Sequence, residues 1–199
     1  SQVLSLTPEA PALASPPLHD GPLVAFPTDT VYALGANALD AKAVLNIFAA
    51  KGRPADNPLI VHVYDRAQLT PLCEVSPLAE KLMDAFWPGP LTLILPRKPA
   101  IPDEVAASLP TVAVRMPSHP VAAALLRACK LPIAAPSANR SGKPSPTTAH
   151  HVLVDMDGRI PLILDGGSCD VGVESTVVAV TSGAPCILRP GGITKDMLE

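Results

Sequence analysis

Residues 26–62 read FPTDTVYALGANALDAKAVLNIFAAKGRPADNPLIVH, a stretch that joins a strand end, a polar turn, an amphipathic helix and a loop leading back to a strand. The apolar run at residues 23–26 stops at Pro27, which lacks the N–H that a central strand donates. We therefore expect the polar residues 28–30 to project from the edge of a sheet into a cleft.

One helix follows this turn. Asp40 is a candidate N-cap, and apolar residues recur after it at helical spacing. Lys51 and Arg53 come at its end, where cations commonly complement the helix dipole. Alone, this pattern predicts only a charged cap. A second cluster, SANRSGKPSP at residues 137–146, is equally rich in small hydroxyl and amide groups beside two cations, and it favours a binding role.

Length and composition narrow the class of protein. The 199 residues are ample for one core and short for two domains. With 48% hydrophobic but only 3% aromatic residues, the interior must consist mainly of aliphatic side chains, which suits a sheet covered by helices. The formal charge of −3 argues against a broad basic surface for nucleic acid. No apolar stretch approaches the ~20 residues of a membrane-spanning helix.

The potential metal ligands are scattered. The four cysteines form no C-x-x-C pair, which argues against a zinc site or a dithiol redox motif, and we expect buried free thiols in a reducing compartment. His150 and His151 are adjacent and would point in different directions from a helix. We predict no metal ligand and a cytoplasmic location. The sequence starts without methionine, so organellar targeting stays open. The cysteines are Cys73, Cys129, Cys169 and Cys186.

Residues 1–22 are rich in proline and alanine, and we expect an irregular N-terminal segment there, followed by one α/β domain over 23–199. Ser76-Pro77 and Ser145-Pro146 each place a capping residue before proline, which predicts helix starts. The fold class is α/β, a single twisted, mixed parallel and antiparallel sheet flanked by helices. We expect strands at 23–26, 59–63, 91–95, 112–114 and 133–135, helices near 41–50, 77–87 and 120–128, and added antiparallel strands at 162–164, 177–180 and 187–188.

Several ordered motifs resemble one known family. Neither G-x-G-x-x-G nor G-x-x-x-x-G-K-[ST] occurs in the expected place, so an ATP site would be of another kind. The chain is similar to the Sua5/YciO/YrdC family, whose motifs occur here in the same order and at the same spacing over nearly all of residues 23–194. One departure is Ala33, where the family usually has glycine. The matching stretches are FPTDTVYALGANA at 26–38, KGRPADNPLIVHV at 51–63, TVAVRMP at 111–117, APSANRSGKPSPT at 135–147, ESTVV at 174–178 and LRPGGIT at 188–194.

The resemblance implies a nucleotidyltransferase. In that reaction L-threonine, bicarbonate and ATP give L-threonylcarbamoyladenylate and pyrophosphate, the activated intermediate for N6-threonylcarbamoyladenosine at position 37 of tRNA. The carbamate oxygen attacks the α-phosphorus, so positioning and cations around the developing charge matter most. Mg²⁺ would arrive with the triphosphate, and a downstream transferase would carry the group to tRNA. Weak tRNA binding would fit the family.

The same resemblance implies site residues. Lys51 and Arg53 would stabilise charge at the phosphates. Arg115 suits the substrate carboxylate because its planar fork can hold both oxygens. The implied threonine-binding residues are Thr30, His62, Arg115, Ala135 and Ser175, and the implied ATP-binding residues are Lys51, Arg53, Asn57, Thr111, Ser137, Asn139, Ser145 and Arg189.

Other interpretations stay open at this stage. The hydroxyl and amide groups could simply close turns, and His62 could be a hydrogen-bonded core histidine. Glu174 could merely pair with an arginine. At the level of the whole chain, the alternatives are a domain that handles a carbamoyladenylate in hydrogenase maturation and a non-catalytic module for double-stranded RNA or tRNA.

Overall fold

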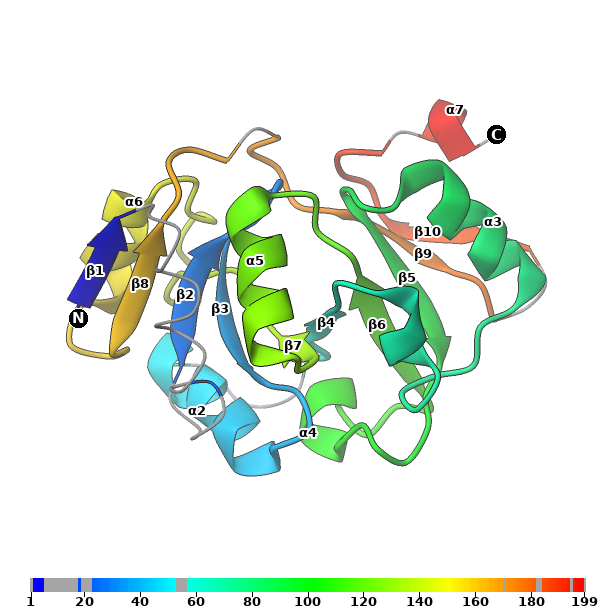
Figure 1. Ribbon diagram of the computed structural model, residues 1–199, viewed down its shortest axis with the longest axis horizontal. Helices are drawn as coiled ribbons and strands as arrows, with labels where there is room; N and C mark the ends of the chain where they lie inside the picture. Colours follow the sequence, from blue (N-terminus) through cyan, green and yellow to red (C-terminus); the bar gives the residue numbers. More distant parts are fainter. Residues whose placement is uncertain are drawn as a thin grey trace.

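The computed structural model describes residues 2–5, 18, 23–52, 57–169, 171–181, 184–193 and 195–198. Within them the chain forms ten strands, which are β1 Gln2–Ser5, β2 Val24–Pro27, β3 Tyr32–Asn37, β4 Ile60–His62, β5 Leu91–Pro96, β6 Thr111–Arg115, β7 Ile133–Ala134, β8 Leu162–Asp165, β9 Thr176–Ala179 and β10 Cys186–Arg189. They make one twisted sheet in the order β1-β8-β2-β3-β7-β4-β6-β5-β9-β10 (Figure 1). The sheet contains parallel and antiparallel pairs, so the predicted fold class is confirmed.

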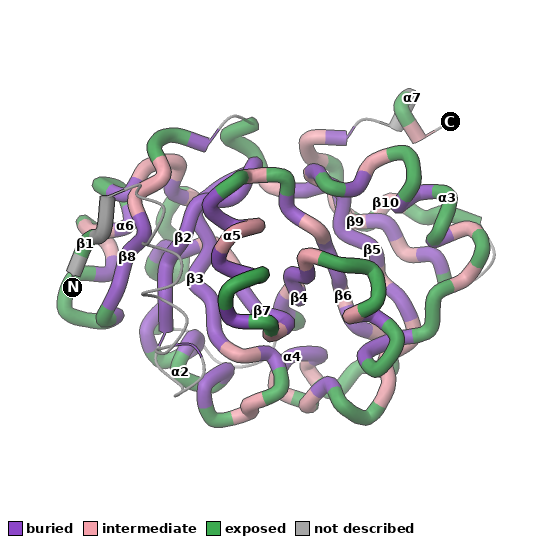
Figure 2. Tube along the Cα trace, viewed as in Figure 1, coloured by how far each residue is buried: buried purple, intermediate pink, exposed green. Residues whose placement is uncertain are grey.

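Helices flank this sheet. They are α2 Ala41–Lys51, α3 Pro77–Phe86, α4 Asp103–Ala106, α5 Pro120–Cys129, α6 Ala149–Met156 and α7 Lys195–Leu198, with a short 3-10 helix, η1, at Arg66–Leu69. Helix α5 lies across β2, β3 and β7 in the centre of Figure 1 and packs Val121, Leu125 and Leu126 on that face. Helices α2, α3 and α6 contribute to the larger apolar cluster. The strands between these layers are largely buried, as Figure 2 shows.

The strand β3 was not predicted from the sequence. It pairs with β2 on one side and β7 on the other, and its first five residues are buried on both faces, so its sequence lacks a polar and apolar alternation. Gly35 lies in its middle because a Cβ there would come within 2.7 Å of both Ile133 and Phe26. A glycine in a strand interior ordinarily weakens a strand prediction, and here it permits close packing.

Helix α2 follows its sequence signals. The Asp40 side chain accepts hydrogen bonds from the N–H groups of Lys42 and Ala43, which confirms the predicted N-cap. Gly52 ends the helix in the left-handed conformation at φ 73°. The last helical residue, Lys51, is only 3% exposed. Its buried position is unusual for lysine and indicates a specific partner.

One of the two predicted helix starts is wrong. Ser76 caps α3 as expected, with Pro77 as the first helical residue. Near residue 146, however, the helix α6 begins only at Ala149 and is capped by Thr148. The reason is local pairing: the Pro146 carbonyl accepts a hydrogen bond from Tyr32 N–H, which holds this segment extended.

The last strands also differ from expectation. We predicted antiparallel strands from the short spacing between them, and only β9 with β10 pairs that way. Strand β8 is parallel to β1 and β2, and β9 is parallel to β5. Each of these strands pairs with a partner distant in sequence, and short spacing gives no information about such partners.

Two further features concern the ends of the sheet. Gln2–Ser5 forms the edge strand β1 and Leu18 is fully buried. The rest of the irregular segment expected over 1–22 lies outside the described residues. The boundary at residue 23 stays a prediction.

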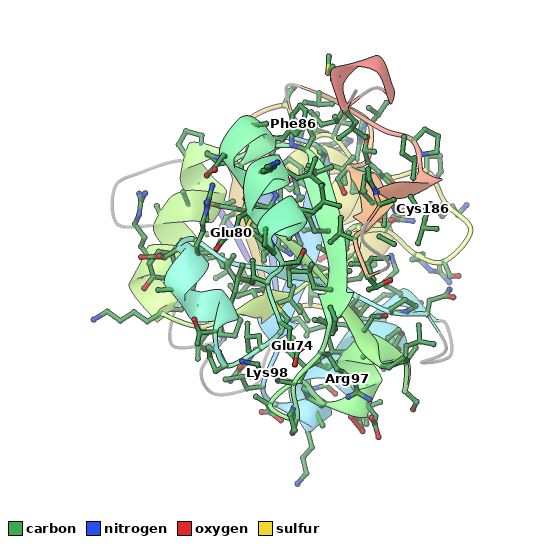
Figure 3. All side chains as sticks on the ribbon, turned by 90° about the vertical axis from the view of Figure 1, so that its right-hand side faces the viewer. Glu74, Glu80, Phe86, Arg97, Lys98 and Cys186 are labelled. Carbon is green, nitrogen blue, oxygen red and sulfur yellow. The ribbon has the colours of Figure 1, made fainter. Side chains whose placement is uncertain are left out.

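Cysteines 73, 129 and 169 are buried as expected, whereas Cys186 is exposed on β10, at the opposite edge of the sheet from β1 (Figure 3). In the described part of the chain, no helix is long and apolar enough to cross a membrane.

Candidate functional site

A cavity of about 460 Å³ opens on one face of the sheet. Strand residues alternate between the two faces. On β4 and β6, Val61, Val112 and Val114 belong to the apolar core. The alternate residues line the cavity, and they are Ile60, His62, Ala113 and Arg115. The cavity therefore lies over β4, β6, β5 and β9, beside the part of the sheet that α5 covers. Its lining includes Thr28, Thr30, Ala33, Asn57, His62, Ile94, Arg115, Ala135, Ser137, Glu174, Ser175, Val177 and Arg189.

The cavity wall contains one buried arginine. Arg115 Nη1 donates to Asp29 Oδ1 at 2.9 Å, and the side chains are 3% and 6% exposed. Burial lowers the pKa of the Arg115 guanidinium, and the Asp29 carboxylate opposes this shift. The backbone N–H of Ser118 also donates to Asp29 Oδ1, while Asp29 Oδ2 is buried without a hydrogen-bond partner in the described chain. Asp29 therefore fixes one side of the guanidinium.

The turn between β2 and β3 presents hydroxyl groups to the same cavity. Thr28 Oγ1 donates its single proton to the Val31 carbonyl at 2.7 Å. The proton in the 2.9 Å contact between Thr28 and Thr30 therefore belongs to Thr30. Arg115 Nη2 donates to Thr30 Oγ1 at 3.3 Å. With its own proton engaged, the Thr30 hydroxyl faces a ligand as a hydrogen-bond acceptor.

His62 is a neutral imidazole in the cavity wall. Burial, followed by the charge of Arg115, lowers its pKa to about 3. Its Nδ1 lies 3.1 Å from the Ile60 carbonyl, which accepts a hydrogen bond when Nδ1 carries the proton. The ring also contacts Phe26 edge to face. His62 both belongs to the core and lines the cavity, so the two interpretations offered by the sequence are compatible.

The opposite wall is built around Arg189. Its Nε and Nη2 donate to the Ser175 carbonyl at 3.1 and 2.9 Å, and Nη2 also reaches Ser175 Oγ at 3.2 Å. Its Nη1 forms an ion pair with Glu174 Oε2 at 3.0 Å. Glu174 Oε1 in turn accepts from the Ser145 hydroxyl at 2.8 Å. Glu174 thus pairs with an arginine, as the sequence suggested, and it also joins two residues that the family resemblance assigns to ATP.

Lys51 anchors the second sequence cluster. Its Nζ donates to the Ser137 carbonyl at 2.6 Å and to Asn139 Oδ1 at 3.4 Å. Asn139 Nδ2 donates to the carbonyls of Arg140 and Lys143, which closes the loop. The lysine therefore links the end of α2 to residues 137–143, and it lies beside the cavity wall at Ser137.

The structure brings most of the predicted residues together. Thr30, Asn57, His62, Arg115, Ala135, Ser137, Ser175 and Arg189 line the cavity. Lys51, Asn139 and Ser145 touch lining residues or their loop without lining the cavity. Thr111 lies on β6 two positions before the lining residue Ala113. Arg53 is outside the described residues.

Sequence reasoning was incomplete for several residues. Thr28 and Thr30 line the cavity as expected of residues 28–30, whereas Asp29 is not among the lining residues and pairs with Arg115, a partner that only the fold reveals. The apolar floor formed by Ile94, Ala113 and Val177 carries no motif signal. No group of three His, Cys, Asp or Glu side chains that could hold a metal occurs in the described ranges.

Comparison with known proteins identifies the family. A family model named Sua5_yciO_yrdC and described as "Telomere recombination" matches residues 17–191. The chain belongs to this family. It is 58% identical over 190 residues to the threonylcarbamoyl-AMP synthase of Bacillus subtilis, covering 94% of this chain and 55% of that protein.

Solved structures agree. The crystal structure of P. abyssi Sua5 complexed with L-threonine superposes with a TM-score of 0.97 at 50% identity, over all of this chain and 60% of that one. The E. coli YciO structure superposes with a TM-score of 0.87 at 25% identity, over 96% of each chain. The chain spans about half the length of these curated relatives at 50–58% identity.

Proposed function

We propose that the protein is an L-threonylcarbamoyladenylate synthase, which forms threonylcarbamoyl-AMP and pyrophosphate from L-threonine, bicarbonate and ATP. The observation that carries the proposal is that Thr30, His62, Arg115, Ala135 and Ser175, five residues from separate motifs, line one cavity. Relatives at 50–58% identity named threonylcarbamoyl-AMP synthase support it.

The amino-acid end of the cavity has suitable chemistry. Arg115 is held on one side by Asp29, and its planar guanidinium can receive a carboxylate. Thr30 offers an acceptor to an N–H or O–H group of the substrate. The apolar residues Ala33 and Ala135 line the cavity and are small enough to leave room for a threonine-sized ligand.

The nucleotide end would be formed by the other lining residues. Arg189, Asn57 and Ser137 line the cavity, and Lys51 donates a hydrogen bond to the Ser137 carbonyl. In this proposal Arg53, four residues before Asn57 in the chain, would stabilise charge at the phosphates. The transfer itself requires in-line placement of the carbamate oxygen and stabilisation of charge on the phosphates, which cations and N–H donors supply.

Divalent metal is part of the substrate in this scheme. Mg²⁺ accompanies triphosphates and typically keeps several waters with one or two carboxylates. Among the described residues that line the cavity, Glu174 is the one acidic side chain, and it is already paired with Arg189. The donor set therefore fits a metal that enters with ATP and is held chiefly by phosphate oxygens.

The proposed role has a place in tRNA modification. The adenylate would be consumed by a transferase that carries the threonylcarbamoyl group to adenosine 37 of tRNA. Residues 23–199 would form the catalytic domain, and contact with tRNA would be weak because the chain carries a formal charge of −3.

Pyrophosphate release tests the proposal. The purified chain is given ATP, Mg²⁺ and bicarbonate with L-threonine, with L-serine or without amino acid. We expect release that requires both threonine and bicarbonate, and a mass-identified threonylcarbamoyl-AMP product. Arg66→Ala, which alters an exposed arginine outside the cavity, should release pyrophosphate as the wild type does. Folded protein that releases no pyrophosphate with threonine, yet binds tRNA in a salt-dependent way, would favour the RNA-binding module.

A further inference from the structure

A buried threonine lies behind the cavity. Thr92, on β5, is fully buried and is not among the lining residues. Its Oγ1 is 2.7 Å from Ser175 Oγ, and Ser175 does line the cavity. The two meet because β5 and β9 are parallel neighbours, with Leu91 opposite Thr176. No motif in the sequence marks Thr92.

The protons in this cluster can be assigned. A hydroxyl group has one proton and two lone pairs. Arg189 Nη2, 3.2 Å from Ser175 Oγ, can only donate, so it occupies one lone pair of Ser175. In the part of the chain that the structure describes, Thr92 Oγ1 makes one hydrogen bond, to Ser175. A buried hydroxyl that left its proton unpaired would be penalised, so Thr92 donates and fills the second lone pair.

The Ser175 proton is then directed away from both neighbours. We infer that Thr92 is a positioning residue that makes Ser175 a hydrogen-bond donor toward an anionic oxygen of the bound amino acid, either its carboxylate or its carbamate. This inference rests on the proposed function. It gives Ser175 the opposite polarity from Thr30, whose proton is used by Thr28.

The polarity has a chemical consequence. An ammonium or N–H group would find no free lone pair on Ser175, whereas an anionic oxygen would receive a short, charge-assisted bond. Without the Thr92 hydroxyl, Ser175 regains a lone pair and its proton can turn toward the site of the lost partner. The amino acid then loses a fixed donor, while the nucleotide contacts are unchanged.

The test uses variants that separate the hydroxyl from the packing. Thr92→Val keeps the branched shape and removes the hydroxyl, and Thr92→Ser keeps the hydroxyl. We expect Thr92→Val to raise the KM for L-threonine about tenfold, with the KM for ATP within about twofold, and Thr92→Ser to stay near wild type. In a double-mutant cycle, Thr92→Val should add little to Ser175→Ala because Thr92 acts through Ser175.

Three results would overturn the inference: a wild-type KM for threonine in Thr92→Val, an equal rise in both KM values, or losses that multiply in the double variant. Thr92→Ala replaces Thr92→Val if the latter does not fold. Calorimetric titration of L-threonine repeats the comparison without turnover. An inactive wild type that still binds threonine would contradict the proposed function alone, whereas a wild type that neither reacts nor binds threonine would contradict both proposals.

Discussion

The guanidinium of Arg115 and the carboxylate of Asp29 form an ion pair 2.9 Å long in which both side chains are almost fully buried. The pair joins the turn between β2 and β3 to the end of β6, and hence two walls of the cavity. Nη1 donates to Asp29 and to the Gly89 carbonyl, and Nη2 is the donor that reaches Thr30 in the cavity wall. The relationship therefore bears on both stability and ligand binding.

Removing the carboxylate should destabilise the fold strongly. Asp29→Ala leaves a buried guanidinium without its counter-charge, and we expect a loss of about 3–5 kcal/mol in the free energy of unfolding. Urea denaturation measures it. The matched control is Asp84→Ala, which breaks an exposed pair with Arg66 at 2.8 Å and should change stability by about 1 kcal/mol or less. Equal losses in the two variants would contradict this account of the buried pair.

Lys51 should matter through the loop that it anchors. Lys51→Met removes the donor to the Ser137 carbonyl while keeping much of the side chain's length, and we expect destabilisation of about 1–3 kcal/mol together with loss of pyrophosphate release. Lys42→Met, an exposed lysine of the same helix, is the control and should leave both unchanged. Full activity in Lys51→Met would refute the assignment of Lys51 to the site.

His62 predicts a specific pH dependence. Its pKa falls from the ordinary 6.5 to about 3 in the folded protein, so the unfolded chain binds the extra proton between these values. This contribution to stability is complete above pH 6.5 and is lost as pH falls toward 3, with a limiting slope of about 1.4 kcal/mol per pH unit. His62→Gln should flatten the stability profile in this window, measured by denaturation from pH 7 to 4. Parallel profiles for the two proteins would show that His62 does not carry the effect.

The ion pair between Glu174 and Arg189 should contribute more to binding than to folding. Both side chains are about 40% exposed, so Glu174→Gln should alter the free energy of unfolding by about 1 kcal/mol or less. The same change loosens Arg189 and Ser145, and we expect a several-fold higher KM for ATP in the pyrophosphate assay. A lower KM for ATP would instead mean that Glu174 chiefly repels the triphosphate.

Gly191 is required for close packing. A Cβ at this position would approach the backbone of residues 174–176, including Thr176 N at 2.7 Å, so Gly191→Ala must displace the strand end that carries Ser175. We expect a loss of more than about 1 kcal/mol in stability and a weaker response to threonine. Gly158→Asn is the control, because asparagine tolerates its φ of 78° and a Cβ there would meet no atom of other segments within 4 Å. Wild-type stability and threonine response in Gly191→Ala would indicate that the segment around residue 191 can move to accept the added methyl group.

The sequence allowed much of the fold to be predicted, for physical reasons. The N-caps Asp40 and Ser76 act within one helical turn, so local sequence identifies them. Pairing between distant strands and the position of β3 depend on tertiary packing, which local patterns do not encode. Gly35 illustrates this, since its need for space arises from Ile133 on β7, a strand nearly a hundred residues later.

The residues of the candidate site likewise fall into those that the sequence could suggest and those that only the fold reveals. Residues in dense motifs, such as Thr30 and Ser175, could be proposed from the family resemblance. Asp29, Glu174 and Thr92 act through other side chains, and their partners are visible only in three dimensions. Ala33 was noted as a departure from glycine. It lies in β3, outside the residues with positive φ, so the strand does not need a left-handed glycine there.

The order in which the cavity walls occur along the chain has a consequence for biosynthesis. Thr30 emerges early from a ribosome, while Ser175 and Arg189, which form the opposite wall, emerge some 150 residues later. At typical elongation rates this separation lasts on the order of ten seconds or more. During that interval a nascent chain carries only part of the cavity wall, and the cavity is complete only when β9 and β10 add to the sheet.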